Sequence, residues 1–429
     1  MNQSIQDSEF WSQARSQILL DPNVINLNTG SFGPLPRVVF ERVTELRRRL
    51  AEEPMDFLIR AALPLLWKAR ERLAQLLEGD PRRLVFTANV TAAINTVATG
   101  LVLPTPGEIL LTDHEYGAMH WCWERAAQRQ GLTLRTFRLP SFPRSPLEIL
   151  DAVREAITDQ TRLLFFSHVL SPTGLVLPAQ EICDEARRRR VLTVIDGAHA
   201  LAMIPLDVNR LGCDFYTGNC HKWLLAPTGA GFLYFGPGSE DRLQPLQVSW
   251  GWRHQSREPE QPESGRPQSR EPERPESGRA GAVMTPMDER DDFGSTPRLR
   301  AFEFEGTRDP CPWLAVPTAI DFQEMLGWDK IRARIAQLTE YVRKRFSRLN
   351  GLRLATPPEP DLCGAMTAFW LPEGTDAARL RSHLWEKRRI EAPVIERPEG
   401  LLIRASTHFY NTEEEIDRLA KALEEYPGN

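Results

Sequence analysis

The sequence predicts an α/β protein: a large domain with a mostly parallel sheet flanked by helices, followed by a smaller α+β C-terminal domain. Between residues 84 and 236, short β-rich runs alternate with segments of helical periodicity, which is typical of βαβ units. A chain of 429 residues is too long for one ordinary domain, and a hydrophobic content of 41% is enough for a sizeable core.

The strands predicted for the large domain are residues 84–87, 109–112, 163–167, 192–196, 215–218 and 232–235. Residues 147–156 and 179–190 carry apolar side chains at spacings of three and four, with charges between them. This pattern predicts helices that cover the sheet.

The C-terminal part begins with a long helical region over residues 317–350. Strands at 365–371 and 401–406 then alternate with helices at 375–387 and 412–425. We therefore expect three parts: an N-terminal segment, 1–25, that packs with the small domain; a large domain, 26–310; and a small domain, 311–429.

One stretch breaks the α/β pattern, because residues 256–268 (SREPEQPESGRPQ) recur almost unchanged as 269–281 (SREPERPESGRAG). The repeat is rich in Pro, Glu, Arg and Ser and has no aliphatic residue before Ala280, so it cannot bury enough apolar surface to offset its ordering entropy. We predict that residues 254–296 are a disordered insertion. A partner-binding tether and a duplication without function both remain open.

Bulk properties exclude several classes of function. The 53 basic and 58 acidic residues give a net charge of −5, so neither nucleic acid nor an anionic membrane is expected as a partner. No secretory leader is visible at the N-terminus, and no segment approaches the roughly 18 apolar residues of a membrane helix, so we expect a cytoplasmic protein. The six cysteines show no C-x-x-C pair, which predicts free thiols and no metal site.

Two segments carry the strongest chemical signal. In 191–200 (VLTVIDGAHA) an apolar run ends at Asp196, and ligands of open α/β sheets collect at the carboxyl ends of strands, although a helix cap or turn would also explain this residue. In 213–235 (CDFYTGNCHKWLLAPTGAGFLYF), Lys222 stands between two apolar strands. It is a candidate Schiff-base lysine, or a lysine in a surface loop.

The two segments reinforce each other, because a pyridoxal-phosphate site needs an imine-forming lysine and a carboxylate that keeps the pyridine nitrogen protonated. D-G-A-H followed by C-H-K and a Gly-rich turn resembles the class V aminotransferase family, over most of the chain. The resemblance implies an aspartate-aminotransferase-like fold with pyridoxal 5'-phosphate on Lys222. It also implies that Asp196 faces the pyridine nitrogen, and that His199 hydrogen-bonds the ring oxygen or orients Asp196.

A phosphate site is predicted in 86–101 (FTANVTAAINTVATGL), where a strand, a turn and a helix follow one another. Thr91 lies where an N-cap would lie, so the free N–H groups of Thr91 and Ala92 are expected to bind phosphate. A capped surface helix is the alternative. The resemblance adds Asn219 and His221 to this phosphate site.

Further motifs match the family in the same way. In 111–123 (LTDHEYGAMHWCW), Tyr116 is expected to stack on the pyridine ring, with His114 as the alternative. In 302–310 (FEFEGTRDP), Gly306 and Thr307 are expected to reach the partner's phosphate, which implies a homodimer with shared active sites. A plain hairpin turn would also explain that segment.

The resemblance also assigns roles to three more segments, at the substrate and at the cofactor. In 401–412 (LLIRASTHFYNT), the resemblance implies that Arg404 clamps a substrate carboxylate. In 26–34 (NLNTGSFGP), Asn28 and Gly30 are expected near the substrate, an amino acid or a similar small molecule. In 168–174 (HVLSPTG), Ser171 is expected at the cofactor, near a position where desulfurases carry Asn.

Departures from the family pattern reduce the number of reactions that we expect of this protein. Cysteine desulfurases carry a nucleophilic Cys before the carboxylate-binding Arg, but residues 390–402 (IEAPVIERPEGLL) contain none. Cys220 in G-N-C-H-K and the H-V-L-S-P-T-G run resemble the isopenicillin N epimerase-like branch instead. We expect Lys222 to act as base at Cα; epimerisation, C–S lysis and transamination remain open. A binding module of this fold without catalysis is the alternative of a different class.

Overall fold

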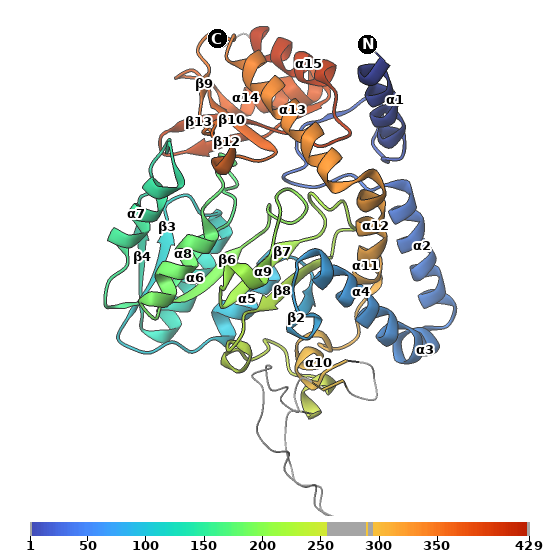
Figure 1. Cartoon of the computed structure of the whole chain (residues 1–429), viewed down its shortest axis with the longest axis vertical. Coiled ribbons are helices and arrows are strands. Elements are labelled where there is room, and N and C mark those ends of the chain that lie inside the picture. The colour runs from blue at the N-terminus through green and yellow to red at the C-terminus, as the bar shows by residue number, and fades with distance from the viewer. Residues whose placement is uncertain (1, 255–288, 291–294, 427–429) are drawn as a thin grey trace, which may run out of the picture.

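A computed structural model describes residues 2–254, 289–290 and 295–426, and shows a large α/β domain with a smaller α+β domain above it (Figure 1). The predicted fold class is confirmed. Most of the predicted insertion, 254–296, lies outside the described residues. At its edges, the short helix η4 (Trp250–His254) packs against α10 (Pro297–Glu303), so the two ends of this segment lie side by side.

The large domain is built on a seven-stranded sheet with the order β2-β8-β7-β6-β5-β3-β4. Strand β8 runs antiparallel to both of its neighbours, and the other adjacent pairs are parallel. The strands are β2 (Leu84–Thr87), β3 (Glu108–Thr112), β4 (Thr133–Phe137), β5 (Thr161–Ser167), β6 (Leu192–Asp196), β7 (Phe215–Asn219) and β8 (Gly231–Phe235). All six predicted strands are present. Edge strand β4 was not predicted, because its polar, partly exposed sequence TLRTF has no apolar run.

Helices cover both faces of this sheet. The apolar residues of α5 (Val90–Gly100) and α6 (Gly117–Gln130) share one core cluster with one face of the strands. Those of α4 (Ala62–Leu76), α7 (Pro146–Ala156), α8 (Ala179–Arg188) and α9 (Val208–Leu211) share a second cluster with the other face. The predicted helices 147–156 and 179–190 correspond to α7 and α8.

The small domain contains an antiparallel sheet with the order β12-β13-β10-β9. Its strands are β9 (Arg353–Leu354), β10 (Met366–Trp370), β12 (Val394–Arg397) and β13 (Gly400–Ser406). Its helices are α13 (Trp328–Phe346), α14 (Ala377–Ser382), which continues as the π-helical turn His383–Lys387, and α15 (Glu413–Glu424). A capping box between Thr412 and Glu415 fixes the start of α15.

The long helix predicted over 317–350 is in fact two helices, α12 (Val316–Leu326) and α13, which is a correction. They break at Gly327, whose φ of +91° lies outside the helical region. Both α12 and the short α11 (Cys311–Leu314) pack on helices of the large domain, α4 and α2 (Arg37–Glu52). This packing favours a domain boundary near Gly327 rather than at residue 311.

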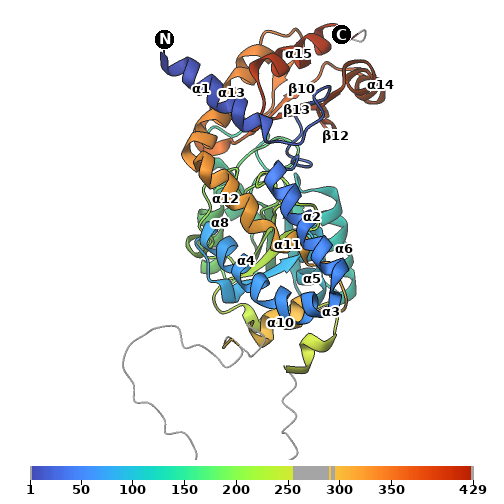
Figure 2. The same cartoon turned by 90° about the vertical axis from the view of Figure 1, so that its right-hand side faces the viewer.

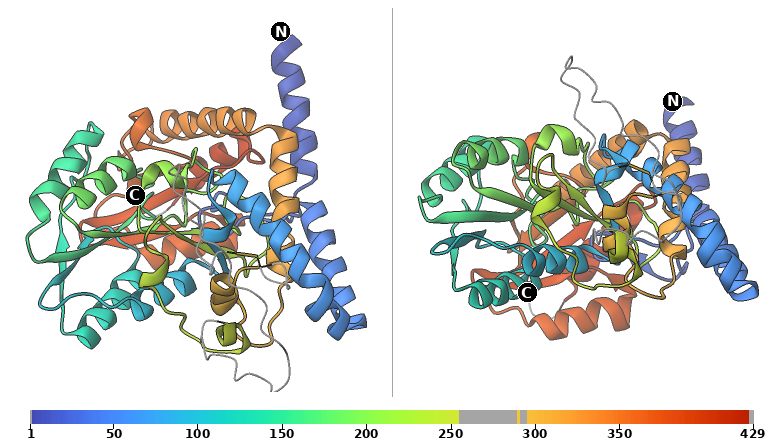
Figure 3. Two further views of the ribbon diagram at one scale, coloured as in Figure 1. Left: turned by 60° about the horizontal axis from the view of Figure 1, so that its bottom comes forward. Right: turned by 90° about the horizontal axis from the view of Figure 1, so that it is seen from below.

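The N-terminal segment lies along the small domain. Helix α1 (Asn2–Ser16) runs beside α12 and α13, and α2 and α3 (Pro54–Asp56) continue down one edge of the large domain (Figure 2). Helix α1 projects beyond the body of the protein (Figure 3). Strand β1 (Ile25–Asn26) pairs in parallel with β11 (Ile390–Glu391), and Arg15 forms an ion pair with Glu415 at 2.6 Å.

Candidate active site

A cavity of about 440 Å³ opens at the carboxyl ends of β5, β6 and β7. Nine residues predicted for the site line it: Gly30, Thr91, Tyr116, Ser171, Asp196, His199, Asn219, His221 and Lys222. The cavity thus joins the first loop of the chain, the start of α5 and the turns that follow β5, β6 and β7. The predicted residues Asn28, Ala92, His114, Arg404, Gly306 and Thr307 do not line it and are treated below.

Lys222 lies in the turn after β7, and its side chain reaches the cavity wall. Its Nζ atom is 3.3 Å from Nε2 of His199. Burial lowers the pKa of Lys222 to about 8; the nearby carboxylate of Asp196 opposes this shift and the guanidinium of Arg404 adds to it. About a tenth of the amine is therefore unprotonated at pH 7, far more than at the ordinary pKa of a lysine, and the unprotonated amine is the form that attacks a carbonyl carbon.

Asp196 is the last residue of β6, and it is 5% exposed. One carboxylate oxygen, Oδ1, accepts a hydrogen bond from the N–H of Ala198 at 2.8 Å, which fixes the side chain at the cavity wall. Burial raises the pKa of Asp196, while the Ala198 N–H and Lys222 act in the opposite direction. In this position the carboxylate has one group of opposite charge near it in the cavity, Lys222, and it can bind a second cationic group.

The N-terminus of α5 points at the same cavity. The helix begins at Val90, and its N-cap is Asn89, whose Oδ1 accepts a hydrogen bond from the N–H of Ala92 at 2.8 Å. The expectation that Thr91 is the N-cap is therefore wrong, since Thr91 is the second residue of the helix. The N–H of Thr91 has no protein acceptor among the described residues, so it is free for an anion, whereas that of Ala92 is held by the cap.

Asn219 and His221 lie beside this helix start. The Oδ1 atom of Asn219 accepts a hydrogen bond from the N–H of Val90 at 3.0 Å, so the end of β7 and the start of α5 are tied together. His221 is buried, and its Nδ1 has no partner among the described residues. Burial, together with the charge of Lys222, lowers the pKa of His221 to about 4, so the ring is neutral at neutral pH.

Tyr116 and His114 were the alternatives for a ring that stacks on the cofactor. Tyr116 is the N-cap of α6, lines the cavity and is 55% exposed. His114 is buried outside the cavity, where burial and the charge of Arg397 lower its pKa. The geometry favours Tyr116.

Arg404 lies on β13 of the small domain and is 3% exposed. Its NH1 donates to the carbonyl oxygen of Ser171, and its NH2 donates to Oδ1 of Asn28 at 3.2 Å. No carboxylate lies within ion-pair distance of this guanidinium among the residues that the structure describes, and its Nε has no acceptor there. A buried cation without an anion is costly, and a bound carboxylate would offset that cost.

Gly30 provides the space next to this guanidinium. A Cβ atom on Gly30 would lie 3.1 Å from NH2 of Arg404 and 3.0 Å from Oγ of Ser406. Both distances are tighter than ordinary contacts, so the absence of a side chain here leaves room beside Arg404. Asn28 is held in turn, because its Nδ2 donates to Oε1 of Glu391 at 3.1 Å.

Gly306 and Thr307 lie elsewhere. They are exposed and line a separate, mainly apolar cavity of about 340 Å³, together with Ile59 and Trp250. Within one chain they do not reach Lys222, so their predicted role requires a second subunit.

Sequence reasoning missed a buried carboxyl group behind the cavity. Glu115 accepts hydrogen bonds from the hydroxyl groups of Thr112 and Ser167, both at 2.6 Å, and burial raises its pKa to about 7. Ser167 lines the cavity and is the register partner of Asp196 on the neighbouring strand β6. The sequence contained two indications of this group: Glu115 directly precedes Tyr116, and Ser167 ends a predicted strand.

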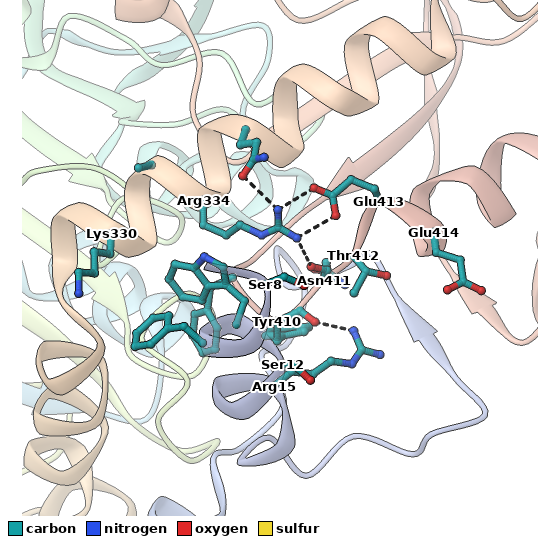
Figure 4. A pocket seen from close by; sticks show the side chains of 15 residues that line it. Ser8, Ser12, Arg15, Lys330, Arg334, Tyr410, Asn411, Thr412, Glu413 and Glu414 are labelled. Carbon is teal, nitrogen blue, oxygen red and sulfur yellow. Dashed lines mark hydrogen bonds and ion pairs between the residues drawn. The ribbon is translucent and has the colours of Figure 1, made fainter. Parts of the chain in front are cut away.

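A larger cavity, of about 930 Å³, lies between α1, α13 and the start of α15 (Figure 4). Its guanidinium groups are already paired: Arg334 forms a bidentate ion pair with Glu413, and Arg15 binds the carbonyl of Tyr410 as well as Glu415. Among the described residues, the polar groups that remain available to a ligand are those of the smaller cavity, around Lys222.

No group of three His, Cys, Asp or Glu side chains is placed to hold a metal ion within residues 2–254, 289–290 and 295–426. In the same part of the chain, no helix is both long and apolar enough to cross a membrane.

Fold and site together define a two-domain α/β enzyme, in which a lysine and a carboxylate at the strand ends line one cavity, and a buried arginine of the small domain lies close enough to lower the pKa of the lysine. The family model described as aminotransferase class V matches residues 35–273 and 287–419. The chain belongs to the class V aminotransferase family.

Relatives within this family differ in their reactions. A protein of Streptomyces clavuligerus described as isopenicillin N epimerase is 55% identical over 97% of this chain and 98% of its own. A second isopenicillin N epimerase, from Amycolatopsis lactamdurans, is 54% identical with the same coverage. A probable L-cysteine desulfhydrase of Arabidopsis thaliana is 26% identical over 94% of this chain and 83% of its own.

Among solved structures, a cystine C–S lyase in complex with cysteine persulfide has a TM-score of 0.76 and 26% identity, over 94% of this chain and 98% of its own. A lysine-to-alanine variant of the same lyase, with glycine covalently linked to the PLP cofactor, has a TM-score of 0.77 and 26% identity, over 96% and 99%. The fold of this chain is that of these pyridoxal-phosphate enzymes.

Proposed function

We propose that this chain is a pyridoxal-phosphate-dependent epimerase that inverts an amine-bearing carbon of isopenicillin N. The observation that carries the proposal is the identity of 55% to an isopenicillin N epimerase over 97% of the chain. The cavity around Lys222 supplies the groups that such a reaction requires.

The residues present fit the cofactor. The free N–H of Thr91 at the start of α5 suits a phosphate, the carboxylate of Asp196 suits a protonated ring nitrogen, and Lys222 offers the amine. Asn219, His221 and Tyr116 complete the proposed pocket. When bound, pyridoxal phosphate supplies an electron-withdrawing ring that makes the α-hydrogen of an attached amino acid acidic.

Lys222 is the proposed base. Its amine becomes free when the substrate amine replaces it, and its lowered pKa leaves it able to accept a proton near neutral pH. His199 lies 3.3 Å from Nζ and holds the amine in place. Inversion requires that the proton is returned to the opposite face of the same carbon.

Arg404 is the proposed carboxylate site. Its guanidinium is buried without an anion among the described residues, and Asn28 and Ser171 fix its orientation through hydrogen bonds. A planar guanidinium binds a carboxylate with two parallel hydrogen bonds, which holds the reacting carbon in one orientation relative to Lys222.

The proposed assembly is a homodimer in which Gly306 and Thr307 complete the partner's phosphate site. Ile59 lines the same apolar cavity as Thr307 and is 47% exposed, and α2 also carries exposed apolar side chains, including Phe40 at 48%. Such a surface is typical of a subunit interface. A cytoplasmic location is also proposed, because the six cysteines are all unpaired.

The sharing of sites can be tested by mixing two inactive variants, Lys222→Ala and Thr307→Glu. If Thr307 serves the partner's site, hybrid dimers contain one intact site, and random exchange restores about a quarter of the wild-type activity. If Thr307 serves its own chain, mixing restores nothing. If it serves no site, Thr307→Glu is already active on its own.

The reaction itself is tested with purified protein and isopenicillin N in heavy water. The expected result is approach to a mixture of two epimers, with deuterium at the inverted carbon in the product. Sulfide release from cystine or cysteine, without epimerisation, would instead assign the chain to the C–S lyases. Lys222→Ala should lose both the visible absorbance of the bound cofactor and the activity.

A further inference from the structure

Trp223, the residue after Lys222, is fully buried and held from three sides. Its carbonyl oxygen accepts hydrogen bonds from Nε2 of Gln323, on α12, at 2.8 Å and from Nε2 of His408, in the small domain, at 3.0 Å. Its ring stacks on that of His408, with centroids 6.0 Å apart and an interplanar angle of 18°. Its indole N–H donates to Nδ1 of His199 at 3.4 Å.

This last contact determines where the proton of His199 lies. An indole N–H can only donate, so Nδ1 of His199 must be an acceptor. In a neutral ring the proton then resides on Nε2, the atom that faces Nζ of Lys222 at 3.3 Å. Burial, together with the charges of Lys222 and Arg404, lowers the pKa of His199 well below its ordinary value, which disfavours a doubly protonated ring.

We propose that Trp223 is a positioning residue that fixes the tautomer of His199, so that an N–H group and not a lone pair faces the cofactor lysine. An N–H directed at Nζ stabilises the neutral amine, whereas a lone pair would stabilise the ammonium form. The inference rests on the proposed function only in taking Lys222 as the cofactor lysine.

Several other charged or titratable groups face this pair. Asp196 at the end of β6, Arg404 on β13 and His221 in the Lys222 turn all act on Lys222 or His199. Among the described residues, the hydrogen-bond partner of Nδ1 of His199 is the indole N–H of Trp223. The charged groups change the cost of protonation, but Trp223 selects the ring nitrogen that carries the proton.

The first test measures the tautomer in the wild-type full-length protein. Long-range ¹H–¹⁵N NMR of histidine-labelled protein, with the His199 signals assigned by their loss in His199→Asn, distinguishes the two ring nitrogens. The expected result is a protonated Nε2 and an unprotonated Nδ1. A proton on Nδ1, or on both nitrogens, would overturn the proposal without any variant of Trp223.

The second test compares Trp223→Phe with Trp123→Phe. Trp123 is also buried, but its indole N–H has no partner among the described residues, so its replacement removes similar volume and no hydrogen bond. The readout is the apparent pKa of Lys222 in cofactor-free protein, from its rate of acylation at a series of pH values followed by mass spectrometry. Trp223→Phe should raise that pKa by about half a unit to one unit.

Trp123→Phe should leave the pKa of Lys222 unchanged. An unchanged value in Trp223→Phe, or an equal shift in both variants, would refute the role of the indole N–H. Failure of the proposed epimerase activity would leave both measurements intact, because neither uses turnover. Loss of cofactor absorbance in Lys222→Ala separately tests the assignment of the lysine.

Discussion

Replacing Arg404 by Met should weaken substrate binding strongly but leave the free energy of unfolding almost unchanged. Arg404 is buried, and no carboxylate among the described residues pairs with it. Burial lowers its pKa from 12.5 to about 10. Because the side chain is charged in both the folded and the unfolded states at pH 7, this lowering is a cost to the folded protein of about 3 kcal/mol.

The replacement removes that cost and also removes hydrogen bonds to Ser171 and Asn28, which together contribute about 2 kcal/mol. The free energy of unfolding should therefore stay within about 1 kcal/mol of the wild-type value, or rise. The loss of a two-pronged, charge-assisted contact should lower kcat/KM at least about a hundredfold.

Arg70 provides the matched control, since it is equally buried but forms an ion pair with Glu303. Arg70→Met leaves the carboxylate of Glu303 buried without its cation and should destabilise the protein by about 3 to 5 kcal/mol. The free energy of unfolding of both variants, measured with denaturant, and their kcat/KM together distinguish a substrate-binding arginine from a structural one. If Arg404→Met is destabilised as much as Arg70→Met, Arg404 is a structural cation and its proposed role fails.

Three further outcomes are expected. Gly30→Ala places a methyl group 3.0 Å from Oγ of Ser406 and should raise KM about tenfold without changing cofactor absorbance; an unchanged KM would remove Gly30 from the substrate site. The pKa of Lys222 is lowered to about 8, so the rate at which cofactor-free protein captures pyridoxal phosphate should rise with pH and level off above about 8; a rise that continues to pH 10 would contradict this. Deletion of residues 256–281 should leave folding and cofactor content intact, because η4 and α10, the described elements on either side of the insertion, pack against each other; loss of folded protein would show the repeat to be structural.

Much of the large domain could be predicted because its central strands are continuous apolar runs. Strands buried on both faces, such as β5 and β6, appear in the sequence as continuous apolar runs, and the polar residues at their ends indicate the site. The site lysine and Asp196 were found in this way. Edge strand β4, which has polar and half-exposed residues, gives no such signal.

Other features depend on contacts that the sequence does not encode locally. Asn89 and Thr91 are both good N-cap residues, and only the hydrogen bond from Ala92 identifies Asn89 as the cap. The apolar periodicity runs through Gly327, so the break between α12 and α13 could not be placed by pattern alone. The contact of Trp223 with His199 joins side chains from two different turns and follows only from the tertiary structure.

The cysteines bear on which reaction this cavity carries out. A desulfurase needs a positioned thiolate that accepts sulfur, but Cys220 is 0% exposed in the core, and burial raises its pKa well above the ordinary range. Cys363 is partly exposed but is not among the residues that line the cavity around Lys222, where the described wall contains no cysteine. Cys220→Ala and Cys363→Ala should therefore each retain epimerisation within about twofold of wild type. Mass spectrometry after incubation with cysteine is the decisive measurement: a persulfide on either thiol, with alanine as product, would show that sulfur transfer occurs at that thiol.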